Sequence, residues 1–417
     1  MKKKLLIIGH TWPEPQSTAA GTRMLQLIEL FKDAGFTVTF ASAASRSDYS
    51  FQLASVEVEE KAILLNDHSF NEWAQKEQFN AVMYDRFMIE EQFGWRFRES
   101  CPNSINILDT EDLHFLRAAR EVAFKNNEEV SAKHLHSTQA MREIASIYRC
   151  DVTLIISEYE IELLQSQFQI PRELLHYLPF LVGSEALKKL RSGNLKSFQE
   201  RSHFSTIGNF IHKPNYDAVL YLKTEIWPLI RKQLPQAQMH VYGSYESPKV
   251  SQLHNEKQGF LIKGRAVDAN EVIENSKVLL APIRYGAGLK GKLFTAMETG
   301  TPFVGTSVAT EGIFSKVEPR EKVKSNSFDH PADFAQQAVQ LYINENLWNQ
   351  QQELGFQSLH SRFDQKLFYD DFISIINDVM INLEHHRLHN FMGQLLQQQA
   401  FNSTKYFSQW IEEKNRR

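Results

Sequence analysis

Short apolar runs alternate with longer segments in which apolar residues recur every three or four positions. The run KLLIIG near the N-terminus is continuously apolar, which is typical of a strand buried on both faces. The next segment, TRMLQLIELFKDAG, has Leu27, Leu30 and Phe31 at helical spacing and ends in a glycine, a common helix stop. Because another apolar run, FTVTFAS, follows directly, the pattern predicts a parallel sheet covered by helices.

This alternation occupies two separate parts of the chain. The runs AVMYD, INILD and VTLIIS continue the strands of the first part. After residue 200 the pattern restarts with HFSTIGNF and continues with MHVYGS, FLIKGR, VLLAPI and PFVGTS. We therefore predict two α/β domains, at residues 1–180 and 204–364, joined by a linker at 181–203 and followed by a helical tail at 365–417.

The tail is polar and rich in glutamine, but it keeps four large aromatic residues near its end. These are Phe401, Tyr406, Phe407 and Trp410. Apolar side chains within a polar helix indicate that one face is covered. We therefore expect the tail to cross back to the N-terminal domain or to join two copies of the chain into an oligomer.

Composition narrows the class of protein. Of the 417 residues, 42% are hydrophobic and 23% are charged, which is typical of a globular protein. The formal net charge of −4 lacks the basic excess of a nucleic-acid-binding protein. Cys101 and Cys150 make no disulfide framework and fit a reducing compartment. No apolar run approaches the roughly 20 residues of a membrane helix, so we expect a cytoplasmic protein without a nucleic-acid partner.

A glycine-rich segment after the strand VLLAPI carries the clearest candidate chemistry. RYGAG leads into a helix that begins near Leu289. Glycines let backbone N–H groups approach a ligand, and a helix N-terminus offers unpaired donors and the positive end of the dipole. Lys290 and Lys292 add charge where the dipole disfavours it. An anion with at least two charges, such as a pyrophosphate, would relieve that repulsion. In the plainer interpretation, the glycines shape a tight turn and the lysines point into water.

Two common phosphate-binding motifs are absent from the sequence. No G-x-x-x-x-G-K-S/T run occurs. The first strand is followed by GHTWPEPQSTAAG rather than by the compact G-x-G-x-x-G of a dinucleotide-binding fold. The ligand is therefore not expected to be ATP in a P-loop or NAD on a dinucleotide fingerprint.

Polar residues after the strand INILD form a second candidate site. Asp109, Asp112 and His114 should lie at the carboxyl end of that strand. A histidine there could hydrogen-bond a transferring sugar, and a carboxylate could bind acceptor hydroxyls. Alternatively, Asp112 or Thr110 caps the next helix and His114 is a surface residue. The spacing does not fit a D-x-D metal site, and no metal is expected.

Five segments of the second domain resemble one known family. GNFIHKPNYDAV, IWP, VYGS, APIRYGAGLKGKLFTAME and PFVGTSVATEG occur in this order within residues 208–312. Together they resemble the C-terminal half of GT-B glycosyltransferases of the family-four-like group, the glycosyl transferases group 1. The N-terminal half resembles the group more loosely, through a loop that ends at Gly21 and Arg23 and through the segment LDTEDLHFLRAAR.

The resemblance implies a GT-B architecture, with two Rossmann-like domains facing each other across a cleft and a helical C-terminal tail. It implies transfer of a sugar from a nucleotide-diphosphate sugar to an acceptor hydroxyl, in glycan or glycoconjugate synthesis. The donor would bind mainly to the second domain and the acceptor mainly to the first. The family usually reacts with retention at the anomeric carbon and without a bound metal, and no cofactor is implied. A glycan, a lipid and a protein all stay open as acceptors.

The residues and the resemblance together define the expected site. The chemical centre is expected to contain His114, Asp112 and Lys290. The donor site is expected to contain Gly208, Asn209, Lys213, Gly264, Arg265, Arg284, Gly286, Gly288, Leu289, Lys290, Lys292 and Thr295. The acceptor side is expected to contain Gly21, Arg23, Asp109 and Arg117.

One position departs from the family pattern. Many members carry two glutamates eight positions apart, the second of which usually holds the nucleotide ribose. Here Thr295 and Ala287 take their places, and a hydroxyl is a weaker acceptor than a carboxylate. Glu298 and Glu311 are nearby candidates to replace it. Two alternatives therefore stay open: a nucleotide-sugar epimerase of the same architecture, and a non-catalytic GT-B protein that uses the cleft for binding alone.

The linker and the tail each carry one further pattern. ALKKLRSGNLK in the linker is basic with interspersed leucines, so peripheral contact with an anionic membrane is an alternative to a plain connection. His385 and His389 lie four residues apart in the tail. Without further ligands at matching spacing, they indicate a polar helix face rather than a metal site.

Overall fold

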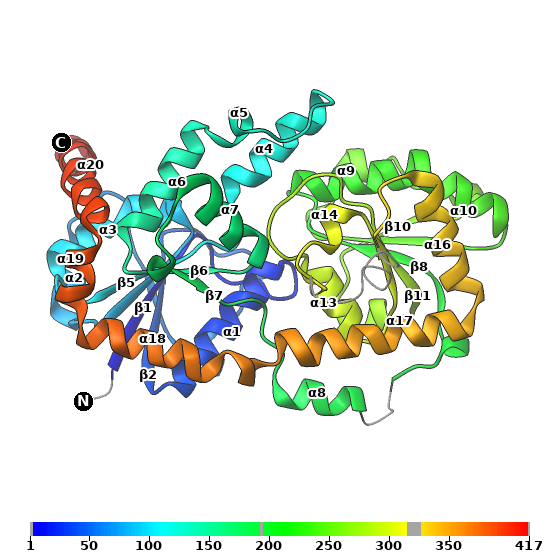
Figure 1. Cartoon of the computed structure of the whole chain (residues 1–417), viewed down its shortest axis with the longest axis horizontal. Helices are drawn as coiled ribbons and strands as arrows, with labels where there is room; N and C mark the ends of the chain where they lie inside the picture. The colour runs from blue at the N-terminus through cyan, green and yellow to red at the C-terminus, as the bar shows by residue number, and fades with distance from the viewer. Residues whose placement is uncertain (1–2, 192–194, 315–326, 416–417) are drawn as a thin grey trace.

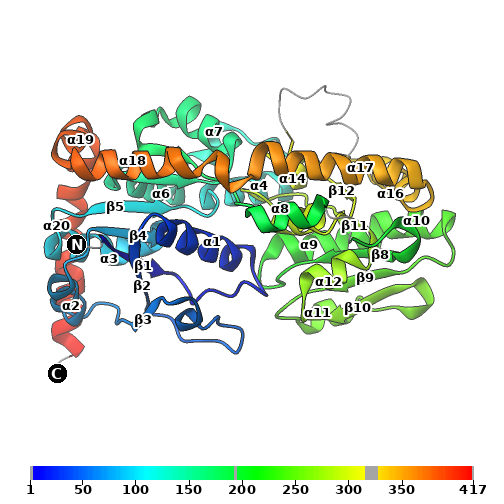
Figure 2. The ribbon, with the colours of Figure 1, turned by 90° about the horizontal axis from the view of Figure 1, so that it is seen from below.

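The computed structural model of this chain describes residues 3–191, 195–314 and 327–415. Two α/β domains lie next to each other along the long axis of the molecule, and a helical C-terminal segment runs back from the second domain along the first (Figures 1 and 2). The predicted class, α/β with two parallel sheets and a helical C-terminal region, is confirmed. None of the described helices combines the length and the apolar character needed to cross a membrane.

The N-terminal domain is built on a seven-stranded parallel sheet of order β3-β2-β1-β4-β5-β6-β7. Its strands are β1 (Lys3–Gly9), β2 (Phe36–Ser42), β3 (Glu59–Ala62), β4 (Ala81–Asp85), β5 (Ile105–Asp109), β6 (Val152–Ile155) and β7 (Leu175–Tyr177). Its helices are α1 (Ala19–Asp33), α2 (Ser69–Glu77), α3 (Phe87–Ser100), α4 (His114–Lys125), α5 (Ala132–Leu135), α6 (Thr138–Arg149) and α7 (Glu158–Phe168), with short 3-10 turns at Leu53–Val56 and Arg172–Leu174. The strand order reverses between β1 and β4, where open α/β sheets place their ligands.

Alternate residues of β1 supply the two cores of this domain. Leu6 and Ile8 pack on one face of the sheet, while Leu5 and Ile7 pack on the other face with residues of α1 and with Phe372 from the C-terminal segment. This arrangement explains why KLLIIG is apolar throughout, since side chains of a strand alternate between faces.

The C-terminal domain has a five-stranded parallel sheet of order β10-β9-β8-β11-β12. Its strands are β8 (Ser202–Ile207), β9 (Met239–Tyr242), β10 (Phe260–Gly264), β11 (Ser276–Ala281) and β12 (Phe303–Gly305). Its helices are α9 (Lys213–Tyr221), α10 (Trp227–Gln233), α11 (Pro248–Ser251), α12 (Ala269–Glu274), α13 (Gly291–Glu298), α14 (Ser307–Thr310), α16 (Pro331–Ile343) and α17 (Glu345–Ser358), with 3-10 turns at Phe198–Glu200 and Glu256–Gln258 and a π-helical turn, Leu222–Ile226, between α9 and α10. Here the order reverses between β8 and β11, so the glycine-rich segment after β11 leaves the sheet at the switch point.

The two domains are joined by two adjacent crossings of the chain. The first crossing leads from β7 into α8 (Ser184–Arg191). The second crossing leads from a π-helical turn at Leu359–Phe363, through a 3-10 turn at Gln365–Leu367, into the C-terminal segment. The amide of Val182 donates to the carbonyl of Phe363, and the amide of Gln365 donates to the carbonyl of Val182. These hydrogen bonds hold the two crossings side by side.

The leucines of the linker are buried in protein. Leu187 and Leu190 in α8 pack into a core of the C-terminal domain with Phe294 and Phe363. The membrane interpretation of the linker needs these leucines to face a bilayer, so their burial argues against it.

The C-terminal segment covers two parts of the N-terminal domain. α18 (Tyr369–Ile381) completes the core that contains Leu5 and Ile7. α19 (Leu383–His389) and α20 (Phe391–Asn415) then lie at the far end of the molecule, with α20 against α3 and α6. Arg387 attaches this end, because its guanidinium donates to both carboxylate oxygens of Asp151 at 2.8 Å and to the carbonyls of Pro102 and Ser104.

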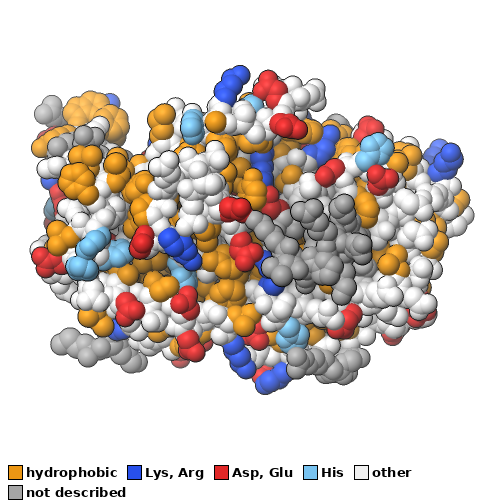
Figure 3. Space-filling view, viewed as in Figure 1, with side chains coloured by type: hydrophobic (Ala, Val, Ile, Leu, Met, Phe, Trp, Pro, Cys, Tyr) orange, Lys and Arg blue, Asp and Glu red, His pale blue; other side chains and the backbone are white. Residues whose placement is uncertain are grey.

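The aromatic residues of the tail do not make this attachment. Tyr406, Phe407 and Trp410 are 63%, 63% and 58% exposed, and hydrophobic side chains gather on the surface at this end of the molecule (Figure 3). The side chain of Phe401 lies outside the described residues. Tyr406, Phe407 and Trp410 therefore do not pack on the N-terminal domain, because polar residues of α20, such as Ser408, make those contacts. The alternative, that they pack on a second copy of the chain, stays a prediction.

We predict that Arg387→Ala destabilises the protein by about 2–3 kcal/mol, because it leaves the buried carboxylate of Asp151 without its charged partner. Arg142→Ala is the matched control. Its partner Glu91 lies on the surface, and Arg142 is 52% exposed, so the loss should be about 0–1 kcal/mol. Denaturant unfolding of both variants measures the difference. Equal free energies of unfolding would contradict the assigned role of Arg387.

Candidate functional site

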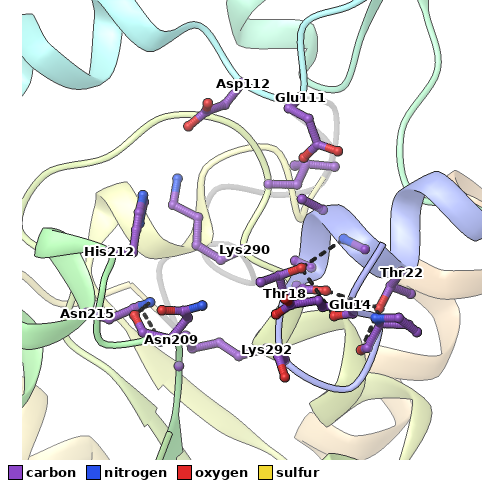
Figure 4. A pocket seen from close by; sticks show the side chains of 18 of the residues that line it. Glu14, Thr18, Thr22, Glu111, Asp112, Asn209, His212, Asn215, Lys290 and Lys292 are labelled. Atoms are coloured by element: carbon purple, nitrogen blue, oxygen red, sulfur yellow. Dashed lines mark hydrogen bonds between the residues drawn. The ribbon is translucent and has the colours of Figure 1, made fainter. Parts of the chain in front are cut away.

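A cavity of about 640 Å³ lies between the two domains. The N-terminal domain lines it mainly with the loops that follow β1, β4 and β5. The C-terminal domain lines it with the loops that follow β8, β9, β10 and β11 and with α13. Both strand-order reversals therefore open into the same cavity. Figure 4 shows residues of both domains at the cavity: Glu14, Thr18, Glu111 and Asp112 come from the N-terminal domain, and Asn209, His212, Lys290 and Lys292 come from the C-terminal domain.

The glycine-rich loop fits closely against the N-terminal domain. Gly288 has a φ of 62°, and a Cβ atom added to it would lie 2.8 Å from Cβ of Asp112. A Cβ atom added to Gly291 would lie 2.5 Å from Cβ of Ala19 in α1. Larger residues at these two positions would push the domains apart, so the glycines set the width of the cleft here.

Lys290 and Lys292 both line the cleft at the start of α13. The ammonium group of Lys290 donates to the carbonyl oxygens of Gly288 at 2.7 Å and Ala287 at 3.3 Å. Lys292 donates to the side-chain oxygen of Asn215 at 3.0 Å. Among the described residues, neither lysine forms an ion pair. Burial lowers the pKa of each lysine to about 8, and for Lys292 the neighbouring Lys290 contributes.

The start of α13 adds backbone donors to this charge. Lys290 is the N-cap residue and makes no side-chain capping bond, and the first turn holds no acidic residue. The N-terminus of α13 and both lysines line the same part of the cleft. This is the arrangement that binds a phosphate or diphosphate.

Asp112, His114 and Arg117 line the opposite wall. Burial acts to raise the pKa of Asp112. The guanidinium of Arg117, 2.8 Å away, and the imidazole of His114, 3.4 Å away, nevertheless hold this pKa below its usual value. Burial lowers the pKa of His114 to about 3 despite the attraction of Asp112. At neutral pH the pair is therefore an ionised carboxylate beside an uncharged imidazole. Arg117 also lies 3.3 Å from Nε2 of His212 in the other domain.

Two buried glutamates, rather than Asp112 or Thr110, satisfy the N-terminus of α4. The backbone amides of His114 and Phe115 donate to Glu143, and that of Leu113 donates to Glu160. Burial raises the pKa of each glutamate to about 8. Because this capping role is filled by others, Asp112 is directed into the cleft.

Glu160 also joins the two domains. Its Oε1 atom accepts from the amide of Gly288 at 2.8 Å as well as from that of Leu113 at 3.2 Å. Arg120 on α4 makes a second junction, with Glu311 at 2.7 Å and the carbonyl of Gly286 at 2.7 Å. These residues hold the glycine-rich loop. No motif in the sequence indicated Glu160, because its partner Gly288 lies 128 positions away.

Arg23 and Asp109 were expected on the acceptor side, but the structure corrects this expectation, because they form a buried ion pair within the N-terminal domain. The guanidinium of Arg23 pairs with Asp109 at 2.8 Å, and both side chains are fully buried. Arg23 also donates to the carbonyls of Leu178 and Pro179 at the first interdomain crossing. Neither residue lines the cleft, because each is engaged by an opposite charge beneath it. Gly21, in contrast, does line the cleft, against the backbone of Glu14.

Arg284 and Lys213, expected in the donor site, are also held elsewhere. Arg284 pairs with Asp217 at 2.6 Å and lies between the rings of Phe124 and Tyr221. Lys213 is on the surface, with its ammonium 3.6 Å from Glu121. Neither lines the cavity.

Gly264 and Arg265, expected in the donor site, do not line the cavity. The guanidinium of Arg265 stacks over the ring of Tyr49 from the N-terminal domain, 4.3 Å from its centroid. Ala266 lines the cavity in its place. The other expected donor residues that line the cavity are Gly208, Asn209, Gly286, Leu289 and Thr295, while Gly288 shapes the loop from behind.

Thr295 and Glu298 lie one turn apart on the cleft side of α13. The hydroxyl of Thr295 donates to the carbonyl of Gly291 within the helix, at 3.3 Å. Burial alone raises the pKa of Glu298 to about 7. No described residue forms an ion pair or a side-chain hydrogen bond with Glu298, whereas Glu311 is paired with Arg120. Of the two candidate carboxylates, only Glu298 faces the cleft.

Among the cleft residues that were not predicted, three stand out by backbone conformation, charge or origin: Arg86, Glu111 and His212. Arg86 and Glu111 adopt positive φ angles of 73° and 63°, a strained backbone conformation that is frequent at functional sites. Burial raises the pKa of Glu111 to about 8. His212 approaches from the C-terminal domain. No sequence pattern indicates backbone strain at Arg86 or Glu111, but His212 lies within the segment GNFIHKPN that supported the resemblance.

Comparison with known proteins agrees with this geometry. Residues 201–344 match the family described as Glycosyl transferases group 1. No curated protein matches the chain. Among solved structures, a mutant of S. aureus TarM in complex with Fondaparinux, alpha-GlcNAc-glycerol and UDP is 10% identical, with 90% of this chain and 100% of that chain covered at a TM-score of 0.66.

Two further structures show the same likeness. Anabaena HepE in complex with UDP and glucose is 12% identical, with 92% of this chain and 100% of that chain covered at a TM-score of 0.60. WaaG, described as a glycosyltransferase involved in lipopolysaccharide biosynthesis, is 12% identical, with 89% and 99% covered at a TM-score of 0.58. The predicted resemblance to group 1 glycosyltransferases and the predicted GT-B architecture are confirmed.

Proposed function

We propose that this protein is a glycosyltransferase that moves a sugar from a nucleotide-diphosphate sugar to an acceptor hydroxyl, with retention at the anomeric carbon, in the synthesis of a glycan or glycoconjugate. The observation that carries the proposal is a pair of lysines, the buried Lys290 and the partly buried Lys292, at an uncapped helix start in the cleft. Their charge lacks an ionic partner among the described residues. A diphosphate supplies that partner.

The lysines would act on the leaving group. As the bond between the anomeric carbon and the β-phosphate oxygen breaks, negative charge grows on the diphosphate, and fixed cations in a buried site stabilise that charge without reorganisation. The backbone of Gly286 to Lys292 and the two ammonium groups would bind the diphosphate. The UDP present in the TarM and HepE structures supports a nucleoside diphosphate as the ligand of this site.

Retention is favoured by the groups on the opposite wall. An inverting enzyme needs a free general base opposite the leaving group. Asp112 is already paired with Arg117, and His114 has a pKa of about 3. In the proposed reaction, the acceptor oxygen attacks the anomeric carbon on the face that the diphosphate leaves, and its proton passes to the departing phosphate. His114 would hydrogen-bond the transferring sugar, and Asp112 would orient His114.

Glu298 would take over the ribose contact that the resemblance assigns to the position of Thr295. Its carboxylate lines the cleft one helical turn further along α13. The hydroxyl of Thr295 is used within the helix, whereas Glu298 has its acceptor oxygens available. Carboxylates are strong acceptors for hydroxyl pairs, so the ribose supplies a fitting partner.

The lysine assignment predicts weaker nucleotide binding in Lys290→Ala and Lys292→Ala. Each change should raise the dissociation constant of the bound nucleoside diphosphate about 10- to 100-fold, because a charge-assisted hydrogen bond is lost. Lys213→Ala is the matched control and should bind normally. Isothermal titration with UDP, GDP and ADP measures these constants.

The same lysines predict a pH dependence of binding. Free lysines with a pKa of about 8 must take up protons to pair with the diphosphate above that pH. Affinity should therefore fall as pH rises from 8 to 10, and more gently in either variant. Unchanged affinity in both variants would contradict the diphosphate site.

The ribose assignment predicts that Glu298→Gln reduces discrimination between nucleotides. The wild-type protein should bind the ribonucleoside diphosphate more tightly than its 2′,3′-dideoxy analogue, since the carboxylate accepts from both hydroxyls. In the variant this ratio should fall about tenfold, the size of one hydrogen bond to a charged group. Thr295→Val is the control and should keep the ratio. An unchanged ratio in Glu298→Gln would assign the ribose to other residues.

The mechanism predicts an α-linked product from an α-linked donor. Proton NMR of the first product formed shows the anomeric configuration, and a β-linked product would contradict same-face transfer. His114→Ala should lower kcat about 100-fold, the typical effect of removing one transition-state hydrogen bond, with little change in donor affinity. Release of a free sugar epimer without any glycoside would instead identify an epimerase.

A further inference from the structure

α20 carries large apolar residues near both of its ends, on its solvent side. We define the α20 stripe as Phe391, Met392, Leu395, Tyr406, Phe407 and Trp410. These side chains are between 37% and 72% exposed. At 100° per residue, all six fall on one side of the helix. Protein surfaces rarely leave so many large apolar groups together unless something covers them.

The opposite side of α20 makes the attachment to the N-terminal domain. Ser408 bonds to Arg96 and Asn66, Gln397 donates to the carbonyl of Arg149, and Gly393 lies against the carbonyl of Tyr148. The stripe therefore points away from its own domain. Both views of the ribbon place α20 at the end of the long axis, where a partner can approach along its whole length (Figures 1 and 2).

Two α20 stripes that run in opposite directions place their large apolar residues side by side. Phe391 and Leu395 are four residues apart at one end, and Tyr406 and Trp410 are four residues apart at the other. The midpoint between Phe391 and Trp410 falls between residues 400 and 401, and so does the midpoint between Leu395 and Tyr406. A two-fold axis at that point would set Phe391 beside Trp410 of a second copy and Leu395 beside Tyr406, which is the reciprocal pairing of a symmetric dimer.

The charges of this end fit a protein partner better than a lipid surface. The segment Leu383 to Asn415 contains three acidic and three basic residues, and none of the six lies in the stripe. An anionic membrane needs a basic polar face beside the apolar one. Lys405 is moreover paired with Glu99, so residues 383–415 offer little positive charge to a bilayer, although Arg416 and Arg417 follow them in the sequence.

The exposed area is also sufficient. Four aromatic side chains of about 200 Å² each, exposed by 58% to 72%, present on the order of 500 Å² in each copy. Met392 and Leu395 add to this area. Two copies would therefore bury on the order of 1,200 Å², at the lower end of stable protein interfaces.

We propose that this protein forms a two-fold symmetric dimer in which the α20 stripes of two copies pair in antiparallel orientation. The interface lies at the opposite end of the N-terminal domain from the cleft. The proposal is independent of the proposed function, and its test needs no nucleotide or acceptor.

Sedimentation velocity of the full chain tests the pairing. The wild type should be dimeric at ~100 µM, where an interface with a micromolar dissociation constant is occupied. Phe391→Glu and Trp410→Glu should each raise that constant at least tenfold, because a charge would be buried without a partner. Val267→Glu is the matched control, since Val267 is 80% exposed on the other domain, and it should stay dimeric. A wild-type chain that is monomeric at this concentration would overturn the proposal.

Disulfide cross-linking tests the orientation. Met392→Cys and Gln409→Cys are symmetric about the same midpoint, and both native cysteines are buried. A mixture of the two variants should form a cross-linked dimer, while either variant alone should not, since its two thiols would lie about 25 Å apart along the paired helices. Cross-linking of each variant alone would show a parallel pair and refute the model. Sedimentation of the wild type with anionic vesicles, abolished in Trp410→Glu, would instead assign the stripe to a membrane.

Discussion

The close fit of the glycine-rich loop against the N-terminal domain is the constraint on which the cleft depends. Gly288 approaches Asp112, and Gly291 approaches Ala19, at distances that a larger residue would not allow. The amide of Gly288 is bound by Glu160 of the other domain. This contact brings the switch points of both sheets to one cavity. The two lysines that follow the loop lie at this contact, Lys290 buried and Lys292 partly buried, and burial lowers the pKa of each.

The positively charged side chains around the cleft fall into two groups: those paired with a carboxylate of the protein, and those without such a partner among the described residues. Arg23, Arg284 and Arg120 are each neutralised by a carboxylate within the protein. Such pairs hold secondary structure and the domain interface in place, and they leave no charge for a ligand. Among the described residues, Lys290 and Lys292 are bonded only to neutral oxygens. A buried cation without an anion is costly, so this asymmetry distinguishes the ligand site from the structural arginines.

The C-terminal helices have two different roles in the same domain. α18 is part of the N-terminal core through Phe372 and Ile376, so the end of the chain is required to complete the first domain. α20 is attached by polar groups and keeps its apolar residues in solvent. The first arrangement ties the two domains together, since the chain must return from the C-terminal domain to fill the N-terminal core. The second leaves a surface that a copy of the chain can cover.

The sequence by itself determined the class of fold and the position of the glycine-rich loop with its two lysines. Apolar runs of strand length separated by helical periods require parallel sheets with helices on both faces, and the loop glycines with Lys290 and Lys292 are adjacent in the chain. Only the tertiary structure decided which charged residues face the cleft. Arg23 and Asp109, or Arg284 and Asp217, are paired across 86 and 67 positions, and no local pattern records such a partner. Glu160 and Glu298 join the site for the same reason. Contacts between elements decide whether a side chain is buried and which way it faces. The surroundings of a side chain, rather than its place in the sequence, decide its charge state.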